Sequence, residues 1–237
     1  MTITYKNEFH DTYAERTVAS ASRIAPMLMK VTPVNSVVDV GCGHGYWLKA
    51  FMDQGVNDVV GMDGSYIDRS SLAIPDSAFV ETDLQKPPKP DRTFDLSVCL
   101  EVAEHLPARC TGAFMDFVTA LAPVSLFSAA IPGQPGNDHI NARWHGFWNE
   151  EFKKRGFACF DFVRPAIWQS EEIFIHYRQN IFVYAREDVL RDPRFADLAA
   201  QPRRNCLTLV DEDTLLQNIG LRALIRSAIK RVKDSRR

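Results

Sequence analysis

Acidic side chains follow three stretches of the chain that have the pattern of buried strands. Asp39 lies in the run VVDVGCGHG, Asp63 ends the run VVGMD, and Asp83 ends the run AFVETD. The carboxyl ends of parallel strands meet at one edge of an open α/β sheet, where such folds bind ligands. A single Asp there is better explained as a helix cap or a solvated loop residue than as part of a binding site. Three at successive strand ends favour a binding site, because carboxylates accept hydrogen bonds from hydroxyl groups and amines.

A glycine-rich turn with the spacing G-x-G-x-G follows the first of these acids, at Gly41, Gly43 and Gly45. Glycine lets a ligand approach the backbone closely. A dinucleotide site usually has the spacing G-x-G-x-x-G and holds a pyrophosphate at a helix N-terminus. Asp39, two residues before Gly41, would repel a pyrophosphate, so the turn favours a ligand with a cationic group and disfavours a nicotinamide dinucleotide. Taken alone, the motif also fits an ordinary tight turn.

A second group of reactive residues follows the predicted strand 94–100. Glu101 lies three residues before Glu104 and four before His105. Each of these pairs would share a face if the segment starts a helix. Two carboxylates and an imidazole can hold a divalent cation. Without a metal, an imidazole there can act as a general base.

The segment 131–148 combines polar groups with aromatic side chains, which suits a pocket for a small acceptor molecule. His139 and Asn141 favour such a site. Trp144 and Trp148, with Phe147, also have the spacing of one helix face, which favours core packing for the aromatic residues.

The elements that must position these residues alternate between short apolar runs and helical patterns. This alternation indicates βαβ units and a parallel sheet. The predicted strands are 36–40, 58–62, 78–81, 94–100, 125–131, 157–163 and 180–185, and the predicted helices are 7–30, 46–54, 108–121, 150–155 and 212–237.

The motifs VVDVGCGHG and FDLSVCLEVAEHLP resemble the first and fourth motifs of class I S-adenosylmethionine-dependent methyltransferases, over residues 35–135. The resemblance implies a Rossmann-like, seven-stranded and mostly parallel α/β sheet with helices on both faces and an antiparallel last strand. It implies S-adenosylmethionine as the cofactor, with Asp39 facing its amino group, Asp63 its ribose and Asp83 its adenine amine. The expected cofactor-binding residues are Asp39, Gly41, Cys42, Gly43, Asp63, Gly64, Ser65, Asp83, Leu84, Leu100 and Glu101.

The E-x-x-E-H segment resembles the metal-binding motif of ubiquinone-pathway O-methyltransferases and of small-RNA 2′-O-methyltransferases. Those families add a ligand after the fifth strand, where this chain has His139. The resemblance implies a divalent cation such as Mg²⁺ held by Glu101, Glu104, His105 and His139. Other methyltransferases carry Glu-His-Leu-Pro here without a metal, so both schemes stay open. The catalytic candidates in either scheme are His139, His105 and Glu101.

The segments PGQPG, RPAIW and YRQN are similar to a bacterial methyltransferase subgroup of sugar and surface-glycan pathways. This similarity implies methylation of a hydroxyl group on a small molecule such as a sugar or glycan precursor. The alternatives are an RNA 2′-O-methyltransferase and a non-catalytic S-adenosylmethionine-binding module. The expected substrate-binding residues are Tyr13, Asn141, Trp144, Tyr177 and Arg178.

Composition and charge restrict the partners. The 237 residues are 46% hydrophobic and 24% charged, as in globular proteins, with a formal net charge of -2. Residues 221–237 hold seven basic side chains and one acid, a local +6 that leaves -8 on the rest. The acidic body argues against nucleic acid as a partner, because phosphate backbones need a broad positive face. The basic carboxy-terminal helix fits peripheral membrane contact, a subunit interface or a solvated helix.

We expect a helical cap over 1–33, a methyltransferase domain over 34–187 and a helical extension over 188–237. The five cysteines are odd in number and contain no C-x-x-C pair, which argues against a disulfide framework or a structural zinc site. The start lacks the pattern of a signal peptide, and no apolar run approaches the roughly 20 residues that span a bilayer. These features together predict a cytoplasmic protein.

Overall fold

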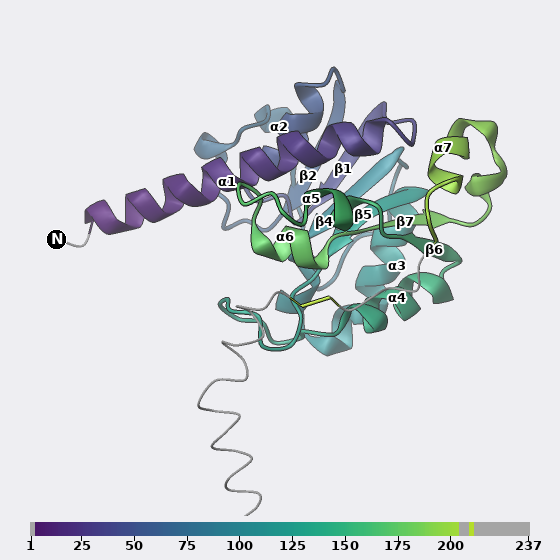
Figure 1. Ribbon diagram of the computed structural model, residues 1–237. Helices are drawn as coiled ribbons and strands as arrows, with labels where there is room; N and C mark the ends of the chain where they lie inside the picture. Colours follow the sequence, from purple (N-terminus) through teal and green to yellow (C-terminus); the bar gives the residue numbers. More distant parts are fainter. Residues whose placement is uncertain (1–2, 204–208, 211–237) are drawn as a thin grey trace, which may run out of the picture.

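The computed structural model describes residues 3–203 and 209–210, with side chains from residue 14 onward. Seven strands form one sheet in the order β3-β2-β1-β4-β5-β7-β6 (Figure 1). Neighbouring strands are parallel except where β7 pairs antiparallel with β5 and with β6. The strands are β1 Ser36–Val40, β2 Asp58–Asp63, β3 Phe79–Glu81, β4 Leu96–Leu100, β5 Val124–Ser128, β6 Phe157–Phe160 and β7 Phe182–Arg186. The predicted Rossmann-like sheet with an antiparallel last strand is confirmed.

Helices cover both faces of this sheet (Figure 1). The α-helices are α1 Ile3–Met29, α2 Tyr46–Met52, α3 Thr111–Leu121, α4 His145–Lys154, α5 Val163–Ile167, α6 Ile175–Asn180 and α7 Ala196–Ala199. Short 3-10 helices connect them: η1 Arg69–Ser71, η2 Asp76–Ala78, η3 Ala103–His105, η4 Ala108–Cys110, η5 Val189–Arg191 and η6 Pro193–Phe195.

Two apolar clusters, one on each face, fix these helices to the sheet. Neighbouring strand residues point to opposite faces, so Val37 packs with α1, α2, α5 and α6, whereas Val38 packs with α3 and α4. Phe51 of α2 and Phe152 of α4 are fully buried in their respective clusters. Because the helices are held on both faces, the loops at the carboxyl edge of the parallel strands keep a fixed arrangement.

Several predicted boundaries are wrong. The fifth strand ends at Ser128 rather than at residue 131, and the sixth ends at Phe160 because α5 begins at Val163. Helix α4 starts at His145, five residues before the predicted start. The predicted helix 212–237, with its membrane or subunit role, lies outside the described residues. Within the described part, no helix has both the length and the apolar character needed to cross a bilayer.

A buried ion pair joins the insertion between β6 and β7 to the sheet. Arg164 of α5 is fully buried and pairs with Asp161, which is 3% exposed. The guanidinium also donates to the backbone oxygen of Gln179 at 2.9 Å and lies 3.9 Å from the ring centre of Phe182. A charge in this position depends on its partner, because removing one member leaves the other charge buried and uncompensated.

Replacing Asp161 with Ala should therefore lower the free energy of unfolding by about 3–5 kcal/mol, measured by urea denaturation. The matched control is Asp188→Ala, which breaks the exposed Arg186–Asp188 pair, in which the side chains are 42% and 66% exposed. That control should change the free energy of unfolding by less than about 1 kcal/mol. Equal effects of the two substitutions would contradict the assignment of Arg164 as a buried charge.

Candidate active site

The glycine turn joins β1 to α2 in a conformation that side chains rarely adopt. Gly41, Gly43 and Gly45 have φ angles of 83°, 53° and 81°. The backbone N–H groups of Gly41 and Cys42 both donate to the oxygen of Met62, at 2.7 and 3.2 Å, which fixes the turn against β2. A Cβ atom at Gly41 would lie only 2.3 Å from Cγ2 of Val102. The turn is therefore bare because the loop after β4 crosses directly over it.

Asp63 ends β2 and organises the loops around it. The side chain is buried, and its Oδ2 accepts a hydrogen bond from the backbone N–H of Gly43 at 2.7 Å. Its Oδ1 accepts from the N–H of Gly64 at 2.7 Å and from the hydroxyl of Tyr66. The carboxylate thus links the glycine turn after β1 to the loop after β2.

Asp39 lies deeper, in β1, and is 3% exposed. Burial, with a smaller contribution from the charge of Asp63, raises the pKa of Asp39 well above its usual range. Its Oδ2 has no hydrogen-bond partner among the described residues. A buried polar atom without a partner costs free energy, and a cationic ligand at this position would supply one.

A cavity of about 520 Å³ opens at this edge of the sheet, within the range of small-molecule sites. Four carboxylates line it, those of Asp63, Glu81, Asp83 and Glu101, and its described lining contains no lysine or arginine. Such a surface favours a ligand that carries positive charge and disfavours an anion. The remaining lining residues are Gly41, Gly64, Ser65, Tyr66, Thr82, Leu84, Gln85, Val102, His105 and Leu106.

The cavity brings together most of the predicted cofactor residues: Gly41, Asp63, Gly64, Ser65, Asp83, Leu84 and Glu101 line it. Asp39, Cys42 and Leu100 are buried beside it, and Gly43 binds Asp63. The sequence predictions missed Glu81 and Tyr66. The position of Tyr66, three residues after Asp63, is the only sequence signal that could have pointed to it.

Glu101 follows β4 in a left-handed conformation, with a φ of 56°. Its N–H donates to the backbone oxygen and to Oγ of Ser128, both at 3.1 Å. Its carboxylate accepts from Nε2 of Gln134 at 2.7 Å and from Nδ2 of Asn180 at 3.2 Å. Desolvation raises the pKa of Glu101, and these hydrogen bonds oppose that shift by favouring the ionised form.

Glu104 is fully buried in η3. Its Oε1 accepts from the backbone N–H of Ala130 at 3.0 Å, whereas Oε2 has no partner among the described residues. Burial, reinforced by the charge of Glu101, raises the pKa of Glu104 to about 9. The segment is a single 3-10 turn and not an α-helix, so the predicted helix face is absent, although the carboxyl groups of Glu101 and Glu104 still interact with each other.

Ligand atoms of Glu104, His105 and His139 all lie within 4.8 Å of one another, close enough to hold one metal ion. The two imidazole rings are 5.1 Å apart, and Nδ1 of His139 lies 3.2 Å from the backbone oxygen of Gln134. Burial, with the charge of His105, lowers the pKa of His139, which favours the neutral ring that binds metals and accepts protons. The fourth predicted ligand, Glu101, does not belong to this cluster.

A family model described as a methyltransferase domain matches residues 11–161, which is more than half of the chain. The chain belongs to this family. Its fold is that of the class I S-adenosylmethionine-dependent methyltransferases, so S-adenosylmethionine is its cofactor. The acidic cavity and the unmatched oxygen of Asp39 fit that cationic molecule.

Solved structures of other methyltransferases share the fold at low sequence identity. CalS10, an amino pentose methyltransferase from Micromonospora echinaspora solved with bound cofactor, is 15% identical with a TM-score of 0.56, over 78% of this chain and 98% of that chain. DesVI from Streptomyces venezuelae is 16% identical with a TM-score of 0.54, over 76% and 96%. The small RNA methyltransferase HEN1 is 18% identical with a TM-score of 0.50, over 70% of this chain but only 25% of that chain. No curated protein matches the chain.

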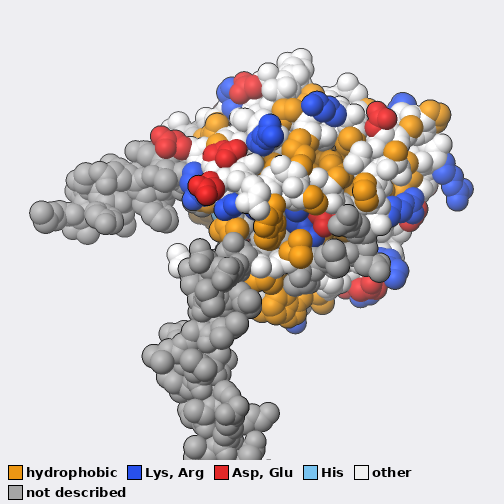
Figure 2. Space-filling model, in the orientation of Figure 1, with side chains coloured by type: hydrophobic (Ala, Val, Ile, Leu, Met, Phe, Trp, Pro, Cys, Tyr) orange, Lys and Arg blue, Asp and Glu red, His pale blue; other side chains and the backbone are white. Residues whose placement is uncertain are grey.

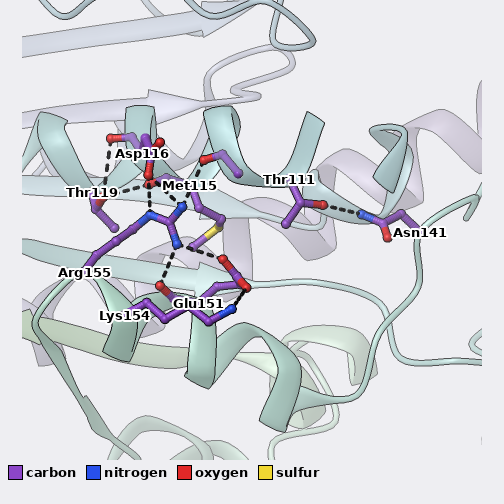
Figure 3. Close-up of polar contacts among 9 residues, drawn as sticks. Thr111, Met115, Asp116, Thr119, Asn141, Glu151, Lys154 and Arg155 are labelled. Atoms are coloured by element: carbon purple, nitrogen blue, oxygen red, sulfur yellow. Dashed lines mark hydrogen bonds and ion pairs between the residues drawn. The ribbon is translucent and has the colours of Figure 1, made fainter. Parts of the chain in front are cut away.

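Asn141 holds the loop that carries His139 in this methyltransferase (Figure 3). It is 3% exposed, and its backbone N–H donates to the oxygen of Glu104 at 2.9 Å. Its Nδ2 donates to Oγ1 of Thr111 at 3.2 Å, and its Oδ1 accepts from Arg143. The side chain predicted to bind substrate is thus occupied by contacts that keep His139 beside Glu104.

A second set of contacts in Figure 3 fixes α4 to α3. Arg155, directly after α4, donates from Nε to Oδ1 of Asp116 at 2.7 Å and from Nη2 to the oxygen of Gly112 at 3.0 Å. Its Nη1 donates to Oε2 of Glu151 at 2.8 Å. Asn141 thus anchors the middle of the segment between β5 and β6, and Arg155 anchors its carboxy-terminal end.

The other residues predicted to bind substrate are dispersed. Trp144 is 49% exposed directly before α4, whereas its neighbour Trp148 is core. Tyr177 is buried, and its hydroxyl accepts from Nε1 of Trp47 at 3.3 Å. Arg178 donates from Nη1 to the backbone oxygen of Trp168 at 3.0 Å. The side chain of Tyr13 lies outside the described part of the structure.

Asp63→Ala should raise the dissociation constant of S-adenosylhomocysteine at least about 100-fold, measured by calorimetry. The reason is the loss of two hydrogen bonds to a charged acceptor, each contributing about 1.5–3 kcal/mol. Asp58→Ala, at the opposite end of the same strand, is the control and should bind normally. Binding of S-adenosylhomocysteine by the folded Asp63→Ala variant at the wild-type level would remove Asp63 from the cofactor site.

Proposed function

We propose that this methyltransferase transfers the methyl group to a hydroxyl oxygen of a small molecule, such as a sugar or a glycan precursor. One observation carries the proposal: His105 lines the acidic cavity and also belongs to the Glu104–His105–His139 cluster. Groups that can activate a hydroxyl therefore border the cofactor cavity. Both CalS10, an amino pentose methyltransferase, and DesVI share the fold.

In this proposal the three acids Asp39, Asp63 and Asp83 each bind a different part of the cofactor. Asp39 binds the amino group, which gives its unmatched Oδ2 a partner. Asp63 binds the ribose hydroxyls, and Asp83, at the cavity wall, accepts from the adenine amine with Leu84 against the ring. Glu101 also lines this cavity, and we propose that it lies near the reacting methyl group.

S-adenosylmethionine supplies a methyl group made electrophilic by a positively charged sulfur. The protein must then align the acceptor with the carbon–sulfur bond, exclude water and take the hydroxyl proton. A new carbon–oxygen bond forms as the carbon–sulfur bond breaks, and the proton passes to a base. His105, which lines the cavity, and His139, kept neutral by its lowered pKa, are the candidate bases.

A divalent cation can take part in this activation. We propose that it is held by the carboxylate of Glu104 and the imidazoles of His105 and His139, with Glu101 outside the inner set of ligands. Oε2 of Glu104, which has no hydrogen-bond partner among the described residues, fits this role once the cation displaces the proton that the raised pKa keeps on the carboxyl group. Two nitrogen ligands favour an ion such as Mn²⁺ over Mg²⁺, which prefers oxygen.

The charge of the cavity supports a small acceptor over a nucleic acid. Its lining carries four carboxylates and, among the described residues, no basic side chain. A nucleic-acid backbone would meet repulsion there, because its phosphates need neutralising cations.

His139→Ala should stop methyl transfer while leaving the affinity for S-adenosylhomocysteine within about twofold, because His139 does not line the cofactor cavity. Mn²⁺ binding, followed by electron paramagnetic resonance, should fall at least tenfold if three ligands become two. The exposed neighbour Ile140→Ala is the control for the loop and should retain Mn²⁺. Normal turnover in His139→Ala would remove His139 from the mechanism.

Metal removal tests the cation separately. Methyl transfer, measured as S-adenosylhomocysteine release in the presence of a panel of neutral sugars, should be lost in EDTA and restored by Mn²⁺. Activity that EDTA leaves unchanged would exclude the cation and leave His139 or His105 as a metal-free base.

A further inference from the structure

Tyr66 occupies an unusual position for a large aromatic side chain. It is 80% exposed, and it lies on the wall of the cofactor cavity. Its ring rests directly on the backbone of Gly64, where a Cβ atom would lie 2.3 Å from Cε1 of the ring. Gly64 therefore provides the flat surface that lets the ring turn its hydroxyl back toward the end of β2.

The hydroxyl of Tyr66 reaches Oδ1 of Asp63. Each carboxylate oxygen accepts two hydrogen bonds in the plane of the group. Oδ1 already accepts a hydrogen bond from the N–H of Gly64, so the Tyr66 hydroxyl fills its second acceptor position. Among the described residues, Oδ2 accepts a hydrogen bond from the N–H of Gly43 alone. The two backbone donors are part of the loops themselves, so Tyr66 is the side chain that can leave without unfolding the site.

A ribose presents two neighbouring hydroxyl groups, and a carboxylate binds them with one oxygen each. Asp63 has room for one such hydroxyl at Oδ2, and the position at Oδ1 is taken by Tyr66. Burial of the hydroxyl and the nearby carboxylate raise the pKa of Tyr66, so the phenol keeps its proton at neutral pH and remains a donor.

We propose that the Tyr66 hydroxyl is a built-in substitute for a ribose hydroxyl, and that cofactor binding requires its displacement from Asp63. This inference rests on the proposed assignment of Asp63 to the ribose. The side chain has room to move into solvent, because its ring is largely exposed. When the cavity is empty, the Tyr66 hydroxyl gives the buried carboxylate of Asp63 a hydrogen-bond donor. Cofactor binding is weaker as a result, because this hydrogen bond must first be broken.

The displacement has a kinetic signature. When only a fraction of the protein molecules can bind, the apparent dissociation constant equals the intrinsic constant divided by that fraction. Tyr66→Phe keeps the ring but removes the competing hydroxyl, so all molecules become competent. We expect S-adenosylhomocysteine to bind about three- to tenfold more tightly, as for the loss of one competing hydrogen bond of ordinary strength. Stopped-flow measurements should assign the gain to a faster association rate, with the dissociation rate unchanged.

Two controls isolate the hydroxyl. Tyr46→Phe removes a hydroxyl from a tyrosine that does not line the cavity and should leave the dissociation constant unchanged. In the Asp63→Ala background, adding Tyr66→Phe should bring no further gain, because the competition exists only through Asp63. Unchanged or weaker binding by Tyr66→Phe alone would overturn the proposal.

A spectroscopic test follows the ring itself. In protein labelled with 3-fluorotyrosine, the ¹⁹F signal missing from Tyr66→Phe belongs to Tyr66, and it should shift when S-adenosylhomocysteine is added. A signal that stays in place would contradict displacement. If Asp63→Ala binds as wild type does, the ribose assignment fails; if it binds weakly while Tyr66→Phe changes nothing, only the role of Tyr66 fails.

Discussion

A carboxyl group taken out of water must find a partner, and this requirement governs the functional edge of the sheet. Asp63 and Glu101 meet it within the protein, through backbone N–H groups, a tyrosine hydroxyl and two side-chain amides. Asp39 and Glu104 meet it only in part, since each keeps one buried oxygen without a partner among the described residues. Burying these two oxygen atoms without hydrogen bonds destabilises the folded protein, and a positively charged group that binds in the site can offset this free-energy cost.

The two unsatisfied acids lie on different elements. Asp39 belongs to β1, and Glu104 belongs to η3, beyond β4. Between them runs the loop in which Val102 covers Gly41, so a shift of that loop would disturb both positions. The backbone hydrogen bond of Asn141 to Glu104 in η3 restrains this region, and Asn141 and Arg155 are themselves bonded to α3 and its N-terminus (Figure 3). Rigidity here matters because methyl transfer depends on alignment of the reacting groups.

The sequence was most informative where chemistry follows from position along one strand. The carboxyl ends of β1, β2 and β3 place Asp39, Asp63 and Asp83 at one edge, and this needs only the strand pattern. Contacts between segments that are distant in the chain could not be predicted in this way. Asn141 looked like a substrate ligand because its loop is polar, but the packing of α3 buries it. Glu101 lies outside the turn that carries Glu104, because the predicted helix is a single 3-10 turn and the N–H of Glu101 binds Ser128, yet the two carboxyl groups still interact.

The reversed direction of β7 has a consequence for the chemistry of this edge. At this edge each parallel strand ends, so the residues that it places there are those that follow it in the chain. Strand β7 runs the opposite way between β5 and β6, so the residues that precede it arrive there instead. Asn180, the last residue of α6, thereby meets Glu101, whose own strand lies two places away. Changes in the α5–α6 insertion can therefore alter the surroundings of Glu101 while the part of the sheet formed by β1, β2 and β3 stays as it is.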